Sequence, residues 1–316
     1  MIEVKNLVKR YGNHLALDNV SFTIEKGEVV GFLGPNGAGK STTMNIITGY
    51  LSSTDGEVLV DGLSVLDEPE KAKQKIGYLP EVPPLYTDMT VNEYLNFVCD
   101  LKKIPSAKKD EVIARVTKQV RISDVRKRLI RNLSKGYKQR VGIAQALIGD
   151  PEVLILDEPT VGLDPKQITE VRDLIKNLSE EHTLIISSHI LAEVQAVCDR
   201  VIIINKGRIV ATDTPDNLAK TAIKSNKLEI RVKGPKNDVL NGIAQIPGIK
   251  FAEIVRIREE GSVDVNIETE EDADVREAIF EFCSENHYPI LLMKTTEVNL
   301  EDIFLQITGE REAKRA

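Results

Sequence analysis

Apolar and polar residues alternate with a period of two near the start of the chain, which is the pattern of a half-buried β-strand. The alternation covers residues 2–4 and 20–24, and a turn at Lys26-Gly27 leads into the apolar run 28–33. We therefore predict that the chain begins with β structure and that the third segment is a buried strand.

Residues 55–150 change from short β segments to a helical pattern. A strand is predicted over 57–60, a charged helix through 71–75, and a strand over 76–81 that runs into a proline-containing loop at 82–90. Apolar residues then recur three and four positions apart over 91–101 and 107–119, which predicts two helices. We interpret this stretch as a helical insertion without a catalytic motif of its own.

The segments after residue 140 alternate between helix and strand patterns. An amphipathic run over 141–149 precedes the apolar run 153–158, which is followed by a helix ending at Leu178 and an apolar strand over 183–187. Continuous apolar strands between helices are typical of a parallel sheet that is covered on both faces. We expect an α/β domain whose ligands bind at the carboxyl ends of its strands.

The pattern changes again after a β segment at 208–211 and a helix at 215–220. Strands are predicted at 227–232, 250–257, 262–267 and 290–294, and helices at 238–246, 274–285 and 299–308. The first six elements have the β-α-β-β-α-β order of a ferredoxin-like α+β fold. We predict a first domain over 1–220, a linker at 221–226, an accessory domain over 227–309 and a charged tail at 310–316.

The accessory domain contains no recognisable catalytic cluster. His287 stands alone, and the acidic run 268–274 is interpreted as a solvated loop and helix start. A structural or dimer-supporting role is expected for this domain, with regulation by a small ligand as the alternative.

Composition limits which classes of function remain. The 316 residues carry a formal net charge of −7 with a pI near 5.4, which argues against a nucleic-acid partner but leaves a local basic patch open. Cys99, Cys198 and Cys283 are far apart, which favours a reduced, cytosolic setting over a disulfide framework or a zinc site. No apolar run approaches the roughly 20 residues of a membrane span, so a membrane process would need another chain.

A glycine-rich loop follows the apolar run 28–33 and precedes a helical pattern. It fits G-x-x-x-x-G-K-[ST], the phosphate-binding loop, and consists of Gly34, Pro35, Asn36, Gly37, Ala38, Gly39, Lys40, Ser41 and Thr42. Lys40 is expected to reach the terminal phosphates of a nucleotide and the Ser41 hydroxyl to bind Mg²⁺. Tyr11, upstream of the loop, could stack on a base or pack on the first sheet, and its position alone favours neither.

Three later segments supply groups that suit a nucleotide at this loop. Ser134 and Gly136 begin a helical run, where free N–H groups suit an anionic oxygen, although N-capping is the commoner role of such a serine. Asp157 and Glu158 end an apolar strand, where phosphate-loop enzymes hold a magnesium-associated aspartate and a general base. His189 follows the next strand, where a structural role is the usual alternative.

In the order GPNGAGKST, LSKGYKQR, LILDEP, VGLD and SSH, these motifs resemble those of the ATP-binding subunits of ABC transporters, over about residues 1–218. The resemblance implies an ABC-type P-loop NTPase domain. This has a RecA-like core, an antiparallel β subdomain and a helical subdomain at about 86–150. The appended domain and its VNLEDIFLQITGE segment are similar to those of the ABC type-2 exporter class, including gliding-motility and multidrug-type members.

The resemblance also assigns roles to single residues. It makes Glu158 the catalytic base, Asp157 the magnesium-associated aspartate and His189 the switch histidine that contacts the γ-phosphate. It makes Tyr11 the aromatic residue that stacks on adenine. Asp164 falls in the loop that communicates between subunits.

The signature motif departs from the family pattern LSGGQ. Lys135 and Tyr137 replace a glycine and the glutamine, whereas Ser134 and Gly136 are kept. In the family this motif completes the site of the opposite subunit, so the resemblance implies that Ser134 and Gly136 act in trans.

Glu81 is a second departure, because it occupies the place of the family's glutamine. Its carboxylate can still bind Mg²⁺, a hard cation that prefers oxygen, beside Ser41 and Asp157. It also adds negative charge near the γ-phosphate, so we expect Glu81 to affect coupling to a membrane partner.

The resemblance implies an ATPase that uses ATP and Mg²⁺ and pairs with a second copy or a close homologue. It would drive a separate integral-membrane permease, with export as the expected direction, from the cytoplasmic face of the cell membrane. One alternative is a soluble ABC ATPase of translation or DNA metabolism, which the single cassette and net acidity disfavour. The other is a ligand-sensing module with a degenerate cassette, which the complete hydrolytic motifs disfavour.

Overall fold

The alternating start of the chain forms a four-stranded antiparallel sheet of order β2-β1-β4-β5. Its strands are β1 (Ile2–Tyr11), β2 (His14–Ile24), β4 (Asp55–Val60) and β5 (Leu63–Ser64). β1 and β2 extend well beyond the predicted segments, because register shifts between Val4 and Arg10 interrupt the period-two pattern. The sequence therefore located this sheet but underestimated its length.

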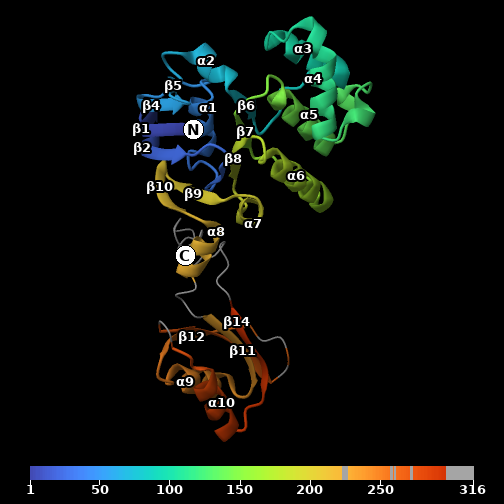
Figure 1. The fold of residues 1–316 in the computed structure, drawn as a ribbon. Helices are drawn as coiled ribbons and strands as arrows, with labels where there is room; N and C mark the ends of the chain where they lie inside the picture. Colours follow the sequence, from blue (N-terminus) through green and yellow to red (C-terminus); the bar gives the residue numbers. More distant parts are fainter. Residues whose placement is uncertain (223–226, 257–258, 260, 271–272, 297–316) are drawn as a thin grey trace. The chain divides into compact units, whose positions relative to one another are not determined.

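The computed structural model describes residues 1–222, 227–256, 259, 261–270 and 273–296. The chain divides into two compact units, Met1–Pro215 and Asp216–Ala316. Figure 1 shows the elements of each unit. The predicted linker at 221–226 lies mostly outside the described residues and stays a prediction.

A six-stranded sheet of order β10-β9-β3-β8-β7-β6 forms the centre of the first unit. Its strands are β3 (Val29–Leu33), β6 (Ile76–Leu79), β7 (Val153–Asp157), β8 (Thr183–Ser188), β9 (Arg200–Asn205) and β10 (Arg208–Asp213). Every pair is parallel except β9 with β10, and β3 and β7 are buried along their whole length. The predicted α/β class is confirmed for this unit.

Helices pack around this sheet and form the insertion. The first group is α1 (Lys40–Ile47), α2 (Pro69–Gln74), α6 (Pro165–Leu178) and α7 (Leu191–Gln195). α8 (Pro215–Ala222) begins at the boundary and belongs to the second unit. The insertion contains α3 (Val91–Leu101), α4 (Ser106–Gln119) and α5 (Lys135–Leu147), which lie together in Figure 1, and the short 3₁₀ helices Ser123–Val125 and Ile130–Asn132. No element was predicted where α7 and β9 lie.

A shared hydrophobic core joins the two sheets of the first unit. Its fully buried members include Ile2, Leu7, Phe32, Met44, Ile47 and Ile155. Gly31, in the middle of β3, leaves room for α7, because a Cβ atom there would lie 2.0 Å from Cγ1 of Val194. The absence of a side chain at Gly31 therefore determines how closely α7 approaches the sheet.

Besides α8, the described part of the second unit contains an antiparallel sheet of order β12-β13-β11-β14 and two helices packed with it. Its elements are β11 (Lys227–Lys233), α9 (Lys236–Ala244), β12 (Ile249–Arg256), β13 (Ser262–Thr269), α10 (Arg276–Glu285) and β14 (Ile290–Thr296). It has a core of its own, which includes Ile230, Val265 and Ile279. The elements follow the predicted order, whereas the predicted helix at 299–308 and tail at 310–316 lie outside the described residues.

Candidate active site

The strand order brings the predicted motifs to one edge of the central sheet. β3, β8, β7 and β6 are parallel neighbours, with Leu33 paired to Ser188 and Asp157 paired to Ser187. The segments that leave the carboxyl ends of these strands therefore begin side by side. This is the edge at which open α/β sheets bind ligands.

The phosphate-binding loop wraps around the amino end of α1. Gly37 and Gly39 have φ angles of 79° and 112°, which glycine adopts most readily, and Gly39 is the N-cap of α1. A Cβ atom at Gly39 would also lie 2.7 Å from Cδ2 of Leu17. Lys40 is buried, and its ammonium donates a hydrogen bond of 2.7 Å to the carbonyl of Gly34. Free N–H groups and a cation therefore converge where an anion would bind.

A cavity of about 590 Å³ lies over this loop. Of the predicted site residues it is lined by Tyr11, Pro35, Asn36, Gly37, Gly39, Lys40, Ser41, Thr42, Glu81, Glu158 and His189. The structure adds His14, Ala16 and Val161. His14 pairs with Tyr11 across the β1-β2 turn. This turn was not predicted from the sequence, and His14 was therefore not identified as a neighbour of Tyr11.

Tyr11 lies on the β1-β2 hairpin at the rim of this cavity. Its ring is 48% exposed, and Nζ of Lys9 lies 5.3 Å from the ring centre. A half-exposed ring at a cavity rim suits stacking on a base better than packing in a core. The position agrees with the role that the resemblance implies for Tyr11.

Glu158 is buried between two basic side chains. Its Oε1 lies 3.5 Å from Nζ of Lys40, and its Oε2 lies 2.8 Å from Nδ1 of His189. Its backbone has φ 49°, and its N–H donates to Oγ of Ser187 at 3.0 Å. A buried carboxylate requires such partners because its desolvation is costly. The three groups predicted to be catalytic therefore form one contact network.

Hydroxyl groups connect the strands that carry these residues. Ser187 on β8 donates a hydrogen bond to Asp157 on β7. Its neighbour Ser188 donates to Oε2 of Glu193 at 3.1 Å, and Thr160 donates to the same oxygen. Glu193 is only 7% exposed. Sequence reasoning missed this network, because its bonds depend on which strands become neighbours.

Ser41, Glu81 and Asp157 supply the oxygen donors predicted for Mg²⁺. Ser41 and Glu81 line both the cavity over the loop and a second, larger cavity, and Asp157 lines the larger one. No cluster of three or more His, Cys, Asp or Glu side chains that could hold a metal occurs among the described residues. This donor set fits Mg²⁺, which binds few protein groups and keeps phosphate and water ligands.

Ser134, Gly136 and Asp164 do not line the cavity over the loop. Oγ of Ser134 accepts the N–H of Tyr137 at 3.4 Å, and Oδ1 of Asp164 accepts the N–H of Gln167 at 2.9 Å, so both residues are N-caps. A Cβ atom at Gly136 would lie 2.8 Å from Cδ of Gln167, so the amino ends of α5 and α6 are in contact. Gly34, Ala38 and Asp157 also do not line this cavity.

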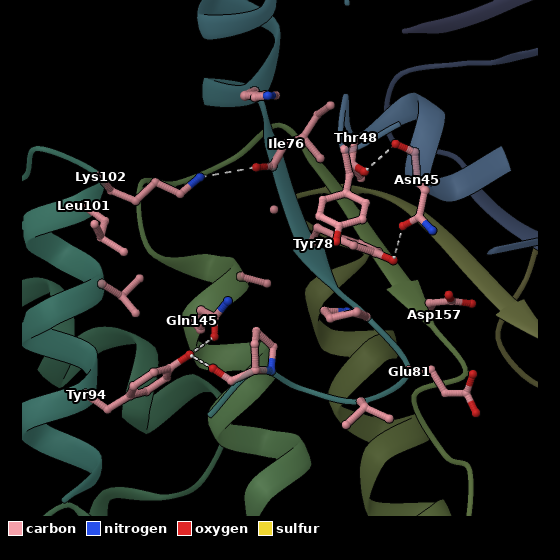
Figure 2. A pocket seen from close by; sticks show the side chains of 18 of the residues that line it. Asn45, Thr48, Ile76, Tyr78, Glu81, Tyr94, Leu101, Lys102, Gln145 and Asp157 are labelled. Atoms are coloured by element: carbon pink, nitrogen blue, oxygen red, sulfur yellow. Dashed lines mark hydrogen bonds between the residues drawn. The ribbon is translucent and has the colours of Figure 1, made fainter. Parts of the chain in front are cut away.

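The second cavity, of about 840 Å³, lies between the central sheet and the helical insertion. In Figure 2, Tyr94 and Leu101 of α3 lie on one side, and Tyr78 and Asn45 on the other. The Tyr78 hydroxyl donates to Oδ1 of Asn45 at 3.1 Å, and the Tyr94 hydroxyl donates to the carbonyl of Pro84 at 3.2 Å and to Gln145. Burial raises the pKa of Tyr94 to about 12.

Comparisons with known proteins identify the family. A family model described as ABC transporter matches residues 17–161. The linearmycin resistance ATP-binding protein LnrL of Bacillus subtilis (strain 168) is 33% identical over 310 residues, which cover 98% of each chain. The chain belongs to the ATP-binding subunits of ABC transporters.

Further relatives of this ABC subunit agree with that assignment. The lantibiotic transport ATP-binding protein SrtF of Streptococcus pyogenes is 40% identical over 211 residues, covering 66% of this chain and 89% of SrtF. A dimeric post-hydrolysis structure of the cassette MJ0796, bound to ADP and Pi, matches with a TM-score of 0.62 and 27% identity. It covers 68% of this chain and 98% of the cassette.

Membership in the family confirms that this ABC subunit binds ATP and is an ATPase. Among the described residues, no helix combines the length and apolar character needed to cross a membrane.

Proposed function

We propose that this ABC ATPase pairs with a second copy or a close homologue around two ATP–Mg²⁺ and powers export through a separate integral-membrane permease. It would act as a peripheral protein on the cytoplasmic face of the cell membrane, as a member of the type-2 exporter class. The second unit would be a ferredoxin-like accessory domain, because its elements have the β-α-β-β-α-β order.

The observation that carries the proposal is the position of Glu158. Its carboxylate lies between Lys40 and His189 at the mouth of the phosphate-binding loop, in a cavity that Tyr11 borders. A carboxylate at this point can orient a water molecule and accept its proton. Lys40 and the N–H groups of the loop would neutralise phosphate charge, and His189 would hold the Glu158 carboxylate in position.

Mg²⁺ would be held by Ser41, Asp157 and Glu81, and when bound it would neutralise charge on the terminal phosphates. Ser187 would keep the Asp157 carboxylate oriented toward that ion through its hydrogen bond. Lys40, Asp157 and Glu158 are each held in place by contacts within the protein, so positioning would account for much of the expected rate enhancement.

The position of the signature motif supports pairing with another copy. Ser134 and Gly136 lie at the amino end of α5 and do not line the cavity. They could contact a phosphate only from a different subunit, and the cassette of known structure named above is dimeric. The proposed dimer would place α5 of one copy over the loop of the other.

The larger cavity supports a contact with a permease. Its rim carries apolar side chains that a monomer rarely exposes together, including Val82 at 79%, Leu101 at 65% and Tyr86 at 53% exposed. Glu81 and Ser41 lie in this cavity and in the nucleotide cavity, so an occupant of one would affect residues of the other. The names of LnrL and SrtF refer to resistance and transport, which favours export.

The decisive test is Glu158→Gln. The amide keeps the shape of the side chain but cannot accept the proton, so we expect kcat to fall about 100-fold or more while ATP binding persists. Steady-state turnover and nucleotide titration would measure both. Glu180→Gln, at an exposed position on the surface, is the matched control and should retain full activity.

Normal turnover by Glu158→Gln would refute the catalytic assignment. The permease assignment has a separate test, which is to purify the tagged full chain from solubilised membranes and identify the membrane protein bound to it. Absence of any integral-membrane partner would contradict it.

A further inference from the structure

Charge is divided unevenly within the first unit. Residues 101–140 contain fourteen Lys or Arg and only three Asp or Glu, whereas residues 1–100 and 141–215 together contain fourteen basic and twenty-six acidic residues. This part of the helical insertion is therefore strongly positive in a chain whose net charge is −7. Positive charges that lie this close together repel one another, and an anionic partner would reduce that repulsion.

Some of these basic side chains pair within the chain. Arg115 pairs with Asp150, Arg131 with Asp88, Lys109 with Asp100 and Arg140 with Glu170. Eight others are exposed and have no acidic partner among the described residues. Lys102 lines the larger cavity and Lys135 belongs to the signature motif. We call the other six the basic border: Lys103, Lys108, Lys118, Arg121, Lys127 and Arg128. Their charges are available to a partner.

The basic border lies at both ends of α3, the helix that lines the larger cavity. Leu101 and Lys102, at its carboxyl end, belong to the cavity wall in Figure 2. Lys103 follows them in the chain, and Lys108 lies in the first turn of α4. At the amino end, the N–H of Val91 donates to the carbonyl of Arg128 at 3.1 Å. Positive charge therefore flanks the cavity at both ends of this helix.

The carboxyl end of α4 brings two more members of the border to the amino end of α3. Lys118 lies in the last turn of α4 and Arg121 directly follows that helix, in the segment that leads to Arg128. Arg126 in the same segment accepts the N–H of Asn92 at 2.9 Å through its carbonyl. The amino end of α3 is thus the more densely charged of the two.

We infer that the basic border binds the anionic phospholipid headgroups of the membrane that holds the permease. The inference rests on the proposed function, because a permease segment in the larger cavity would bring both ends of α3 close to the bilayer. Each Lys or Arg near an anionic bilayer surface contributes favourably to binding, and this attraction declines within a Debye length.

Two other partners, the permease itself and a nucleic acid, fit less well. The cytoplasmic loops of membrane proteins carry a surplus of Lys and Arg, so the permease itself would repel the basic border. A nucleic acid long enough to extend past residues 101–140 would meet the acidic surplus of the remaining first unit. A bilayer is a two-dimensional anionic surface that contacts only the part of the protein facing it.

The experiment uses the purified full chain and vesicles without permease, in a co-flotation assay. We expect binding to vesicles of phosphatidylcholine with phosphatidylglycerol, little binding to phosphatidylcholine alone, and loss of binding at high salt. The variant Lys103→Glu/Lys108→Glu/Lys127→Glu/Arg128→Glu should bind anionic vesicles about tenfold or more weakly. Its ATPase activity should stay unchanged, since none of these residues lines the nucleotide cavity.

The matched control is Lys176→Glu/Lys236→Glu/Lys250→Glu/Lys294→Glu, which changes the net charge equally at exposed sites elsewhere. It should float with anionic vesicles nearly as well as the native chain. Equal losses in both variants, or no preference of the native chain for anionic vesicles, would overturn the inference. Tighter binding to duplex RNA or DNA than to anionic vesicles at the same salt would also overturn it, in favour of a nucleic-acid surface.

The two proposals fail separately. Because the vesicles contain no permease, absence of lipid binding leaves the permease purification test unaffected. Absence of a permease partner would in turn leave the vesicle result as it stands.

Discussion

Glu193 joins the segment that follows Glu158 to the segment that contains His189. Its buried Oε2 accepts hydrogen bonds from Thr160 and from Ser188. Because Thr160 is two residues from Glu158 and Ser188 directly precedes His189, this carboxylate connects the two segments that carry the proposed catalytic residues. We infer that Glu193 is a positioning residue for hydrolysis.

Replacing Glu193 by Ala should lower kcat about tenfold or more and leave the dissociation constant of ATP nearly unchanged, because the catalytic groups shift while the phosphate-binding loop stays intact. Turnover and nucleotide titration provide the two readouts. Glu193→Gln should recover most of the rate, since its amide oxygen accepts the same two hydroxyl groups. Equal defects in both variants would show that the charge, and not the positioning, matters.

Glu81 makes a second prediction at a single residue. Its side chain lines both cavities, and its negative charge would strengthen the binding of Mg²⁺ relative to the family's glutamine. Glu81→Gln should therefore raise the Mg²⁺ concentration that gives half-maximal ATPase activity, by roughly threefold. A Mg²⁺ titration of the rate measures it, with Glu70→Gln, on the exposed surface, as control. An unchanged midpoint would remove any special role of the carboxylate.

Sequence motifs located Lys40, Glu158 and His189 because each motif occupies a fixed place relative to a strand end. The partners of these residues were not predictable in the same way. The bond between Ser187 and Asp157 exists because β8 and β7 are neighbours in the sheet, although the two residues are 30 positions apart. A hydroxyl group in a buried strand gives no indication of its partner until the strand order is known.

At the scale of elements, α3 was predicted with its observed ends, Val91 and Leu101, from the spacing of its apolar residues, and the structure adds a second signal at its start. Its apolar residues have helical spacing, and Thr90 and Glu93 form a capping box, with hydrogen bonds of 3.2 Å and 2.8 Å. β1 and β2 lack such agreement, since their register shifts break the alternation.

Tyr94 connects two elements of the helical insertion, and its removal should loosen them. The hydroxyl donates to Pro84, in the loop before α3, and to Gln145 on α5. Tyr94→Phe should lower the free energy of unfolding by about 0.5–1.5 kcal/mol, because two partly buried hydrogen bonds of the hydroxyl group are lost. Urea denaturation measures this change.

Tyr86→Phe is the matched control for Tyr94→Phe. The Tyr86 ring contacts Tyr94 and Phe97, but its hydroxyl makes no hydrogen bond within the described residues. Its stability should be close to that of the native chain. A loss in Tyr86→Phe as large as that in Tyr94→Phe would contradict the role of the buried hydroxyl group.

At the scale of the whole molecule, the two units have separate hydrophobic cores. Heating should therefore produce two transitions, and ATP with Mg²⁺ should raise only the one that belongs to the first unit. The Glu158→Gln variant suits calorimetry, because it should bind ATP without consuming it. At a ligand concentration of 100 times the dissociation constant, the gain is about 2.7 kcal/mol.

Lys40→Ala is the control for this calorimetric experiment, because it should remove the shift while leaving both transitions in place. A single transition that moves as a whole with ATP would show that the two units unfold as one.

The separation of charge within the first unit also affects how the protein is oriented as it approaches an anionic surface. With a basic insertion and an acidic remainder that nearly cancel, this unit has little net charge but a large electric dipole moment. A dipole in the field of an anionic surface experiences a torque, so the insertion would turn toward that surface before contact. Orientation in advance shortens the rotational search for a docking geometry, and salt at about 0.1 M would confine that advantage to distances within about 10 Å of the surface.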